Sequence, residues 1–470
     1  MLAVLQYGGK RLLQRSSRNF SVKRQSNVLS ILKERGFIHQ LTHEQELEHE
    51  LSSFPQVIYS GIDPTASSLH IGHLLPLMSL LHFQLHGHTV ISLMGGATGL
   101  VGDPSGRKLE REPADAQQVE SNINSISAAV RKFFTRALQY AQRRAPAGTT
   151  LEVTPPILQS NITWHQGFGM LEFLRTVGIH ARVNAMISRD SVRTRLESST
   201  GLSFTEFTYQ LLQAYDFLYL NRHFNCTIQV GGSDQWGNII AGLELMNRSI
   251  SPDVKAFGIT TPLLTTASGE KFGKSAGNAV WLDANLTSVF DFYQYFLKVE
   301  DADVENYLKM FTLLSIPEVQ EIMQRHWLEP EKRIAQRTLA AEVTELVHEA
   351  NGAAQAEKTS KAVFRQPDTK TKSLDARSIL GAFEGDPRLK WCDHVELTTT
   401  PVIKLASKYG LVSSTSAARQ LVQSRGLYLN DKVVPEIHFT MKTHDLLDGR
   451  IAMVRAGKDK LLILATSCDT

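Results

Sequence analysis

The chain has 470 residues, of which 42% are hydrophobic and 21% are charged, and its formal net charge at pH 7 is +3. This length exceeds what one hydrophobic core serves and predicts roughly two to four domains. Every apolar run is shorter than the roughly 20 residues that a membrane span requires, so we expect no membrane segment. The three cysteines, Cys226, Cys392 and Cys468, lie far apart without a CxxC pair, which argues against a disulfide framework and against a zinc site.

The N-terminal segment differs in charge from the rest of the chain. Residues 1–33 contain seven basic residues and no acidic one, interleaved with apolar residues and serine. This pattern is typical of a mitochondrial transit peptide, and the apolar run is too short for a secretory signal. We therefore expect residues 1–33 to be a transit peptide and the protein to reside in the mitochondrial matrix. The pattern does not define the exact cleavage site. A basic RNA-binding arm is the alternative. Without these charges the chain is slightly acidic, so nucleic acid would have to bind to local basic patches.

Residues 34–285 alternate between short strand-like runs and helical segments. A helix is expected within 34–56, and strands are expected at Val57–Ser60, His88–Met94, Leu151–Thr154 and Thr227–Val230. This alternation predicts a doubly wound, Rossmann-like α/β domain with a parallel sheet, whose ligand crevice lies at the carboxyl ends of the strands.

The remaining residues change character twice. Residues 286–380 are helical in pattern, with apolar residues at helical spacing, and residues 381–399 are expected to form a linker. Residues 400–470 hold ten basic and six acidic residues. They predict a helix, a second helix capped by Ser413 or Ser414, and then a turn and a strand, which together make a small α+β module.

The stretch YSGIDPTASSLHIGH, from Tyr59 to His73, is the most informative one. A strand ends there, passes through a turn of small residues and enters a helix, which presents backbone N–H groups to an anion. His70 and His73 are spaced i, i+3 and share a face. Gly72 between them allows a flat ring to lie against the backbone.

Two further stretches carry polar groups in apolar or glycine-rich surroundings. In GGATGLVGDPSGRKLER, Asp103 is suited to an ammonium group, and Arg107 and Arg111 are suited to phosphate or RNA. In FTEFTYQLLQAYDFLYL, Tyr209, Gln213 and Asp216 recur at i, i+4 and i+7 on a helix that is otherwise apolar. Burying such a stripe without partners costs roughly 1–3 kcal/mol per group, so we expect a polar ligand or a hydrogen-bonded core network.

The last two stretches combine glycines with charge. In QVGGSDQWGNI, Gly231 and Gly232 let a nucleotide approach, and a carboxylate at the strand end can accept both ribose hydroxyls. In SGEKFGKSAGN, Lys271 and Lys274 stand three residues apart among glycines. Such a cationic loop suits a pyrophosphate whose charge is met in the transition state.

All five stretches, in this order, resemble the class I aminoacyl-tRNA synthetases, and the tyrosyl branch in particular. His70-Ile71-Gly72-His73 is similar to the His-Ile-Gly-His signature, and Lys271-Phe272-Gly273-Lys274-Ser275 is similar to the tyrosyl variant of the Lys-Met-Ser-Lys-Ser loop. The family commonly has lysine at the position of Arg107, and arginine keeps the charge with a different hydrogen-bonding fork. The C-terminal module resembles the RNA-binding fold named after a ribosomal small-subunit protein. By this resemblance, residues 34–285 form the catalytic domain and residues 286–380 the helical anticodon-binding domain.

The resemblance implies a set of site residues. Those implied for tyrosine binding are Tyr59, Asp63, Asp103, Tyr209, Gln213, Asp216, Gln229 and Gln235. Those implied for ATP binding are Gly61, His70, Gly72, His73, Gly232, Asp234, Lys271 and Lys274. Those implied for catalysis are Thr65, His70, His73, Arg107, Arg111, Lys271, Lys274 and Ser275. In the C-terminal module, the basic residues Lys404, Arg419, Arg425 and Lys432 are expected to bind tRNA.

The implied reaction is activation of L-tyrosine by ATP, followed by transfer to the 3′ end of tRNA(Tyr). We expect Mg²⁺ to arrive with ATP, no metal held by the protein, and a homodimer with an apolar interface after Thr154. A tryptophanyl enzyme of the same fold is the nearest alternative. A non-catalytic RNA-binding protein, such as a splicing helper, is the alternative from another class.

Overall fold

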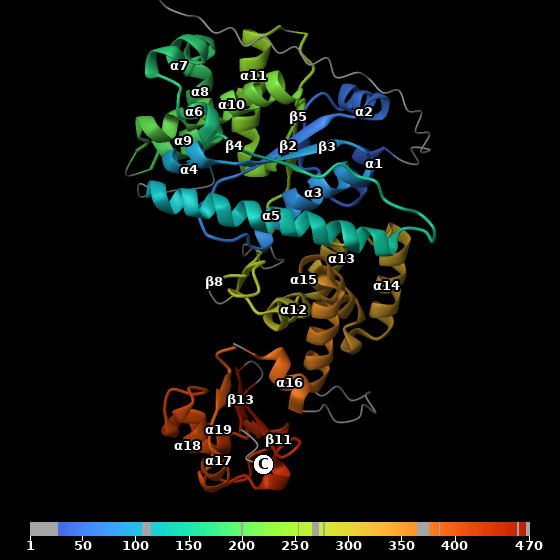
Figure 1. Cartoon of the computed structure of the whole chain (residues 1–470), viewed down its shortest axis with the longest axis vertical. Coiled ribbons are helices and arrows are strands. Elements are labelled where there is room, and N and C mark those ends of the chain that lie inside the picture. The colour runs from blue at the N-terminus through green and yellow to red at the C-terminus, as the bar shows by residue number, and fades with distance from the viewer. Residues whose placement is uncertain are drawn as a thin grey trace, which may run out of the picture.

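The computed structural model describes residues 27–105, 114–198, 201–251, 253–265, 272–275, 278–363, 376–384, 386–457 and 460–466. Three parts follow one another along the long axis of the molecule (Figure 1). An α/β domain occupies one end, a helical part lies in the middle, and a small α+β module occupies the other end. The long helix α5 (Ala116–Arg144) crosses the molecule between the first part and the second.

The α/β domain is built on a six-stranded sheet in the order β1-β6-β5-β2-β3-β4. Its strands are β1 (Gln40–Leu41), β2 (Val57–Ile62), β3 (Thr89–Met94), β4 (Ile157–Ser160), β5 (Ile228–Gly232) and β6 (Phe257–Thr261). All neighbours are parallel except β1 and β6. The doubly wound α/β prediction is confirmed. The chain moves outward in one direction from β2 and in the other from β5, so the crevice for a ligand lies where these two strands meet.

One predicted strand was wrong. Leu151–Thr154 was expected to join the sheet, but β4 begins only after Pro155 and Pro156. The backbone of the earlier segment is bound by side chains instead: Gln84 donates to the Thr154 carbonyl at 2.8 Å, and Leu151 N–H donates to the Gln142 side chain at 2.9 Å. Because proline has no N–H to donate to a ladder, the two prolines delay the start of pairing.

Helices cover both faces of the sheet. Before β5 the elements are α1 (Val28–Glu34), α2 (Glu44–Ser53), η1 (Ile71–His73), α3 (Leu74–Leu85), α4 (Gly96–Val101), α5, α6 (Ile162–His165), α7 (Met170–Thr176), η2 (Gly178–His180), α8 (Val183–Ile187), α9 (Asp190–Leu196) and α10 (Phe204–Phe224). After β5 come η3 (Ser233–Gln235) and α11 (Trp236–Ser249). Helix α10 begins with the Ser203 side chain accepting from Glu206 N–H, and it ends at Asn225 in the left-handed conformation.

The helical part consists of α12 (Val289–Leu297), α13 (Asp301–Phe311), α14 (Ile316–Leu328), η4 (Pro330–Lys332) and α15 (Ile334–Val363), the last broken at Glu349 with φ of 69°. It does not form a separate core, because one apolar cluster runs from α3 and α5 into α13 and α15. The contact between α5 and α15 also carries charge. Tyr140 donates to Glu342 at 2.6 Å, and Arg144 pairs with both Glu342 and Glu345. The α/β domain and the helical part are therefore held together as one packed unit.

The C-terminal module has a five-stranded sheet in the order β11-β10-β12-β13-β9. Its elements are α16 (Ala376–Ala382), β9 (Leu389–Trp391), α17 (His394–Thr399), α18 (Val402–Lys408), α19 (Thr415–Gln423), β10 (Leu427–Leu429), β11 (Lys432–Val433), η5 (Thr443–Asp445), β12 (Ile451–Ala456) and β13 (Lys460–Ala465). The predicted serine cap is confirmed, since the Ser414 side chain accepts from Ala417 N–H at 3.1 Å.

Residues 381–399, which the sequence assigns to a linker, contain the end of α16, strand β9 and helix α17. Strand β9 pairs with β13, and Arg388 forms two 2.8 Å hydrogen bonds to Asp291 of α12. Phe290 and Phe383 pack beside this pair, with ring centroids 5.0 Å apart. A linker was expected here, but these residues obtain their partners from a strand that follows much later in the chain.

No helix in the described part of the chain is long and apolar enough to cross a bilayer.

Candidate active site

A buried carboxylate on α10 is the centre of the site. Asp216 is 2% exposed and accepts three hydrogen bonds. Trp164 Nε1 and His165 Nε2 both donate to Oδ1 at 2.8 Å, and Asn161 Nδ2 donates to Oδ2 at 2.9 Å. All three donors come from the turn and short helix that follow β4. They satisfy a charge that would be costly to bury alone.

The network continues from Asp216 to the far side of the crevice. Asn161 Nδ2 also donates to Thr98 Oγ1 at 3.0 Å, and Thr98 donates to Asp63 Oδ1 at 2.8 Å. Tyr209 donates to the other oxygen of Asp63 at 2.9 Å. One hydrogen-bonded chain thus joins residues that follow β2, β3 and β4 to two positions of α10. Gly95 is needed here, because a Cβ at that position would lie 2.0 Å from Asp63 Oδ1.

Three buried polar atoms near this chain have no partner among the described residues. They are the Tyr59 hydroxyl and the side-chain oxygens of Gln213 and Gln229. Tyr59 lies at the middle of β2 and is 1% exposed. Burial, together with the nearby charge of Asp216, raises its pKa well above the ordinary value, so the phenol keeps its proton and can donate it to a hydrogen bond. Because buried polar groups are normally paired, these three atoms mark where a polar ligand fits.

Asp103 lies at the other side of Tyr209. It follows α4, is 7% exposed, and accepts from Gln235 Nε2 at 2.6 Å and from Ser105 N–H at 2.9 Å. Burial first, and then the charges of Asp63 and Asp103, raise the pKa of Tyr209. Asp63, Asp103 and the protonated Tyr209 hydroxyl therefore form a negatively charged set of groups that suits an ammonium ion.

Asp234 is the second residue of η3, which follows β5 directly, and the amide of its neighbour Gln235 donates to it at 3.1 Å. A Cβ at Gly232 would lie 2.5 Å from the Asp234 carboxylate. The absence of a side chain at Gly232 is what allows this carboxylate to sit at the end of the strand.

The two histidines of the His-Ile-Gly-His stretch pack against each other, with ring centroids 4.0 Å apart. His73 Nδ1 accepts from His70 N–H, and His70 Nδ1 accepts from Gly72 N–H, each at 3.1 Å. Burial and the neighbouring His70 lower the pKa of His73 to about 3, so His73 is neutral. A Cβ on Gly72 would lie 2.8 Å from the His70 ring, so the absence of a side chain there lets this ring pack against the backbone. Thr65, which follows β2, is exposed.

The cationic loop is joined to this histidine pair. Ile71 N–H donates to Val280 at 2.9 Å, Leu282 N–H donates to Leu69 at 2.8 Å, and His70 bridges Trp281. The loop includes β7 (Lys274–Ser275) and β8 (Asn278–Ala279). Phe272 anchors its start, because its ring packs 4.2 Å from Tyr307 in the helical part. Gly273 follows with φ of 93°, a conformation that favours glycine.

Several predicted residues lie outside the described residues. Arg107, Arg111 and Lys271 are among them, and for Lys274 and Ser275 only the backbone is described. The four basic residues predicted to bind tRNA are all exposed on the C-terminal module, at Lys404 of α18, Arg419 of α19, Arg425 after α19 and Lys432 of β11.

Sequence reasoning missed four residues of the site, which are Thr98, Asn161, Trp164 and His165. The last three were overlooked because β4 was placed too early in the chain. Asparagine and tryptophan directly after a strand end, in Asn161-Ile162-Thr163-Trp164-His165, were the available signal.

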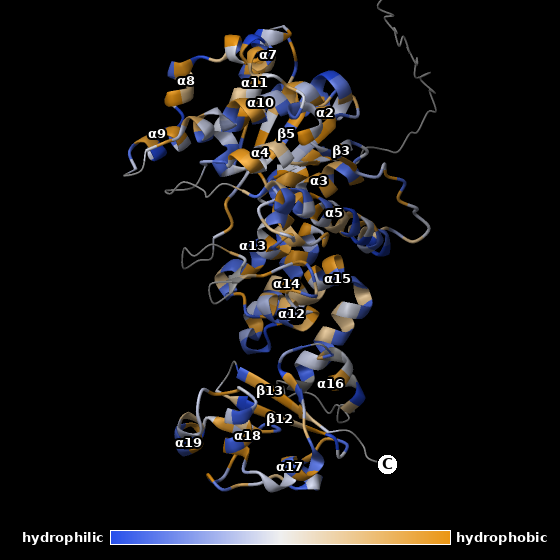
Figure 2. Ribbon diagram, turned by 60° about the vertical axis from the view of Figure 1, so that its left-hand side comes forward, coloured by the Kyte–Doolittle hydropathy of each residue, from blue (hydrophilic) through white to orange (hydrophobic). Residues whose placement is uncertain are grey.

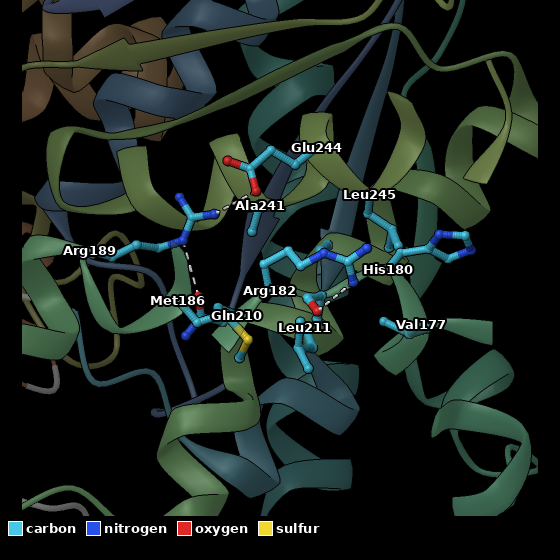
Figure 3. Close-up of a pocket in the computed structure, with 12 residues that line it drawn as sticks. Val177, His180, Arg182, Met186, Arg189, Gln210, Leu211, Ala241, Glu244 and Leu245 are labelled. Atoms are coloured by element: carbon cyan, nitrogen blue, oxygen red, sulfur yellow. Dashed lines mark hydrogen bonds and ion pairs between the residues drawn. The ribbon is translucent and has the colours of Figure 1, made fainter. Parts of the chain in front are cut away.

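A small cavity of about 20 Å³ lies away from the strand ends, between η2, α8, α10 and α11 (Figure 3). Figure 3 shows Arg189 reaching from the start of α9 to Gln210 and Glu244, at 3.1 and 3.4 Å. Burial lowers the pKa of Arg189. This contact holds α9 against the helix that carries Tyr209, Gln213 and Asp216. The residues that line the cavity therefore help to position that helix.

Within the described ranges, no group of three or more histidine, cysteine or acidic side chains is arranged to hold a metal ion.

Comparison with known proteins agrees with this geometry. Residues 53–365 match the family model described as tRNA synthetases class I (W and Y). The mitochondrial tyrosine–tRNA ligase of Drosophila melanogaster is 41% identical over 464 residues, which cover 96% of each chain. Tyrosine–tRNA ligase 1 of Bacillus subtilis is 41% identical over 439 residues, or 93% of this chain and 99% of that protein.

Among solved structures, a C-terminally truncated mitochondrial tyrosyl-tRNA synthetase of Aspergillus nidulans superposes with a TM-score of 0.66 and 36% identity, covering 72% of this chain and 95% of that one. The chain therefore belongs to the class I tRNA synthetases of the tryptophan and tyrosine family, and within that family to the tyrosyl-tRNA synthetases.

Proposed function

We propose that the protein activates L-tyrosine with ATP and transfers it to the 3′ end of tRNA(Tyr), with the substrate phenol held between Tyr59 and Asp216. The observation that supports this pocket most strongly is the unpartnered, buried Tyr59 hydroxyl close to a carboxylate with an acceptor position left. The substrate hydroxyl donates to Asp216 and accepts from Tyr59. Phenylalanine would leave the Tyr59 hydroxyl and the remaining acceptor position of Asp216 unpaired, which is how such a site rejects it.

The amino-acid head-group lies at the other end of the hydrogen-bonded chain. Asp103, Tyr209 and Gln213 bind the ammonium group, with Asp63 holding the Tyr209 hydroxyl at 2.9 Å. Gln229 and Gln235 orient the carboxylate of the substrate. A tryptophan substrate would place an indole against Asp216 and Tyr59, which together match a hydroxyl that both donates and accepts.

ATP lies along the carboxyl ends of β2 and β5. Asp234 accepts the ribose hydroxyls, and Gly61, Gly72 and Gly232 leave room for the nucleotide. Thr65, His70 and His73 contact the phosphates and ribose, and the neutral state of His73, whose pKa is about 3, makes it a hydrogen-bonding group at neutral pH. Mg²⁺ enters with ATP, as is usual for a cation that binds phosphates and water, and it offsets charge on the phosphates.

The first step is an in-line substitution at the α-phosphorus. A carboxylate oxygen of tyrosine forms the new P–O bond while the bond to pyrophosphate breaks, and the electron pair leaves with pyrophosphate. The protein supplies position and charge, which is the main protein contribution in phosphoryl and nucleotidyl transfer. Lys271, Lys274, Ser275, Arg107 and Arg111 close over the departing pyrophosphate. A ribose hydroxyl of the tRNA then attacks the activated carbonyl and AMP leaves.

The helical part and the C-terminal module bind the tRNA. Lys404, Arg419, Arg425 and Lys432 are exposed on one small module, where they reach the RNA backbone. The docking of this module through Arg388 and Asp291 gives it a defined direction relative to the active site.

The protein forms a homodimer through an apolar surface on α7, η2, α8, α9 and the start of α10. Met170 is 65% exposed, Leu171 78%, Ile179 64%, Val183 58% and Phe204 69%. Figure 2 shows α7 and α8 coloured largely as hydrophobic, and α9 partly so, at the outer edge of the α/β domain. Exposed apolar side chains that gather on neighbouring elements are typical of a protein interface, and these elements lie after Thr154, where the interface is expected.

The protein acts in the mitochondrial matrix, and its leader is removed before Asn27. Helix α1 supports this boundary, because Val28, Leu29 and Leu32 are at most 2% exposed in the main core. Cleavage at residue 33 would remove these side chains from the core.

Asp216→Asn keeps the size of the side chain and removes its charge. We expect the ratio of kcat/KM for tyrosine over phenylalanine to fall about 10- to 100-fold, as for loss of a hydrogen bond to a charged group. Tyr59→Phe should lower the same ratio with less disturbance of the fold. Tyr215→Phe, whose ring packs on Phe168 at 4.8 Å, is the matched control. An unchanged ratio in both site variants would contradict the phenol site.

Lys274→Ala should lower the rate of tyrosyl-adenylate formation about 10²-fold or more, with little change in the Kd for tyrosine, because its charge meets pyrophosphate only in the transition state. Stopped-flow measurement of the first turnover separates the two quantities. Lys132→Ala, at an exposed position on α5, is the control. Equal losses in rate and in tyrosine affinity would exclude a transition-state role.

Leu171→Asp places a charge in the proposed interface. Light scattering after size exclusion should give about twice the 52.4 kDa chain mass for the full-length protein, and the single-chain mass for the variant. Leu328→Asp provides a matched control, because Leu328 is 81% exposed on α14, outside the apolar surface. A variant that remains dimeric would place the interface elsewhere.

N-terminal sequencing of the protein purified from mitochondria should give a first residue that follows Arg24, the last basic residue of the leader, and that lies no later than Asn27. A mature chain that still begins at Met1, or one that lacks α1, would contradict the proposed processing.

A further inference from the structure

We infer that His165 is a specificity-determining positioning residue, which fixes the orientation of Asp216 so that one particular oxygen receives the substrate hydroxyl. The inference rests on the proposed phenol site and names a residue that the motifs do not contain. His165 ends α6, and its side chain is 7% exposed against 2% for Asp216.

The argument begins with the acceptor capacity of Asp216. An ionised carboxylate has about four acceptor positions, two on each oxygen. Oδ1 accepts from Trp164 and from His165, and both of its positions are therefore filled. Oδ2 accepts only from Asn161 among the described residues. One position therefore remains, and it is on Oδ2.

The arrangement also determines that Nε2 of the His165 imidazole carries a proton. To donate to Asp216 at 2.8 Å, His165 must carry a proton on Nε2. The ring is held for this task, because it packs edge-on to Tyr215 with centroids 5.6 Å apart, and because the His165 backbone N–H donates to the Asn161 carbonyl at 3.1 Å. The same asparagine that binds Oδ2 therefore also anchors the backbone of the residue that binds Oδ1.

The consequence concerns selectivity more than affinity alone. With His165 in place, rotation of the carboxylate would break two bonds on Oδ1, so Oδ2 stays aimed at the substrate. Without this donor, Oδ1 has an open position, and the carboxylate can turn or take up water. A carboxylate that has turned away or bound water is satisfied equally well with tyrosine or phenylalanine in the pocket, so the site loses part of the penalty that phenylalanine meets.

Two substitutions separate donation from packing. His165→Phe keeps an aromatic ring and removes the N–H, whereas His165→Gln keeps an N–H donor near the position of Nε2 and removes the ring. Pyrophosphate exchange with tyrosine and with phenylalanine gives kcat and KM for each variant. We expect His165→Phe to lower the tyrosine-over-phenylalanine ratio of kcat/KM about tenfold, mainly through a higher KM for tyrosine, with the KM for ATP unchanged. His165→Gln should restore the ratio to within about threefold of the original protein.

The control is His223→Phe, since His223 stacks on Tyr219 with centroids 4.1 Å apart in the neighbouring aromatic cluster. If His165→Phe does not fold, His165→Met takes its place in the experiment, because methionine also lacks the donor and has a flexible side chain. A ratio that is unchanged in the variant without the donor, or one that falls only in His165→Gln, would overturn the inference. If Tyr59→Phe lowers the ratio while the His165 variants do not, the phenol site stands and only the role of His165 falls.

Discussion

The structure of the site depends on keeping one charged carboxylate buried. Asp216 is almost inaccessible to water, and such a charge is tolerated only where hydrogen bonds satisfy it. Its three donors come from the segment after β4, and one of them, Asn161, connects through Thr98 to Asp63 and Tyr209. The two ends of this chain, which we propose bind the phenol and the head-group of the substrate, are therefore parts of one network. A change at either end is expected to be felt at the other.

A second constraint is the way in which the cationic loop is attached to the rest of the structure. The His-Ile-Gly-His stretch and the cationic loop lie side by side through backbone hydrogen bonds of Ile71 and Leu282. Phe272 ties the same loop to the helical part, next to Tyr307. Since the helical part shares its core with the α/β domain, the loop is anchored on both sides.

The sequence was informative where motif and strand end coincide. The parallel sheet could be predicted from the alternation of strand-like and helical runs. Tyr59, Asp103, Asp216 and Asp234 could be named from their motifs, and the structure places them within β2, after α4, within α10 and in η3. The donors to Asp216 could not be predicted. They depend on where β4 begins, and two prolines moved that point beyond the run that looks most like a strand. Strand β9 was not predicted within the linker expected at 381–399 for a similar reason. The strand with which β9 pairs, β13, lies about seventy residues later. Pairing over such distances leaves little local signal.

The central claim is that one pocket binds a phenol and an amino-acid head-group beside a site for ATP. Exchange of labelled pyrophosphate into ATP, measured with the purified full-length protein, Mg²⁺ and one amino acid at a time, tests it most directly. The account predicts exchange with tyrosine and at most a small fraction of that rate with phenylalanine or tryptophan. Exchange that tyrosine does not stimulate, or that tryptophan stimulates more strongly, would contradict it.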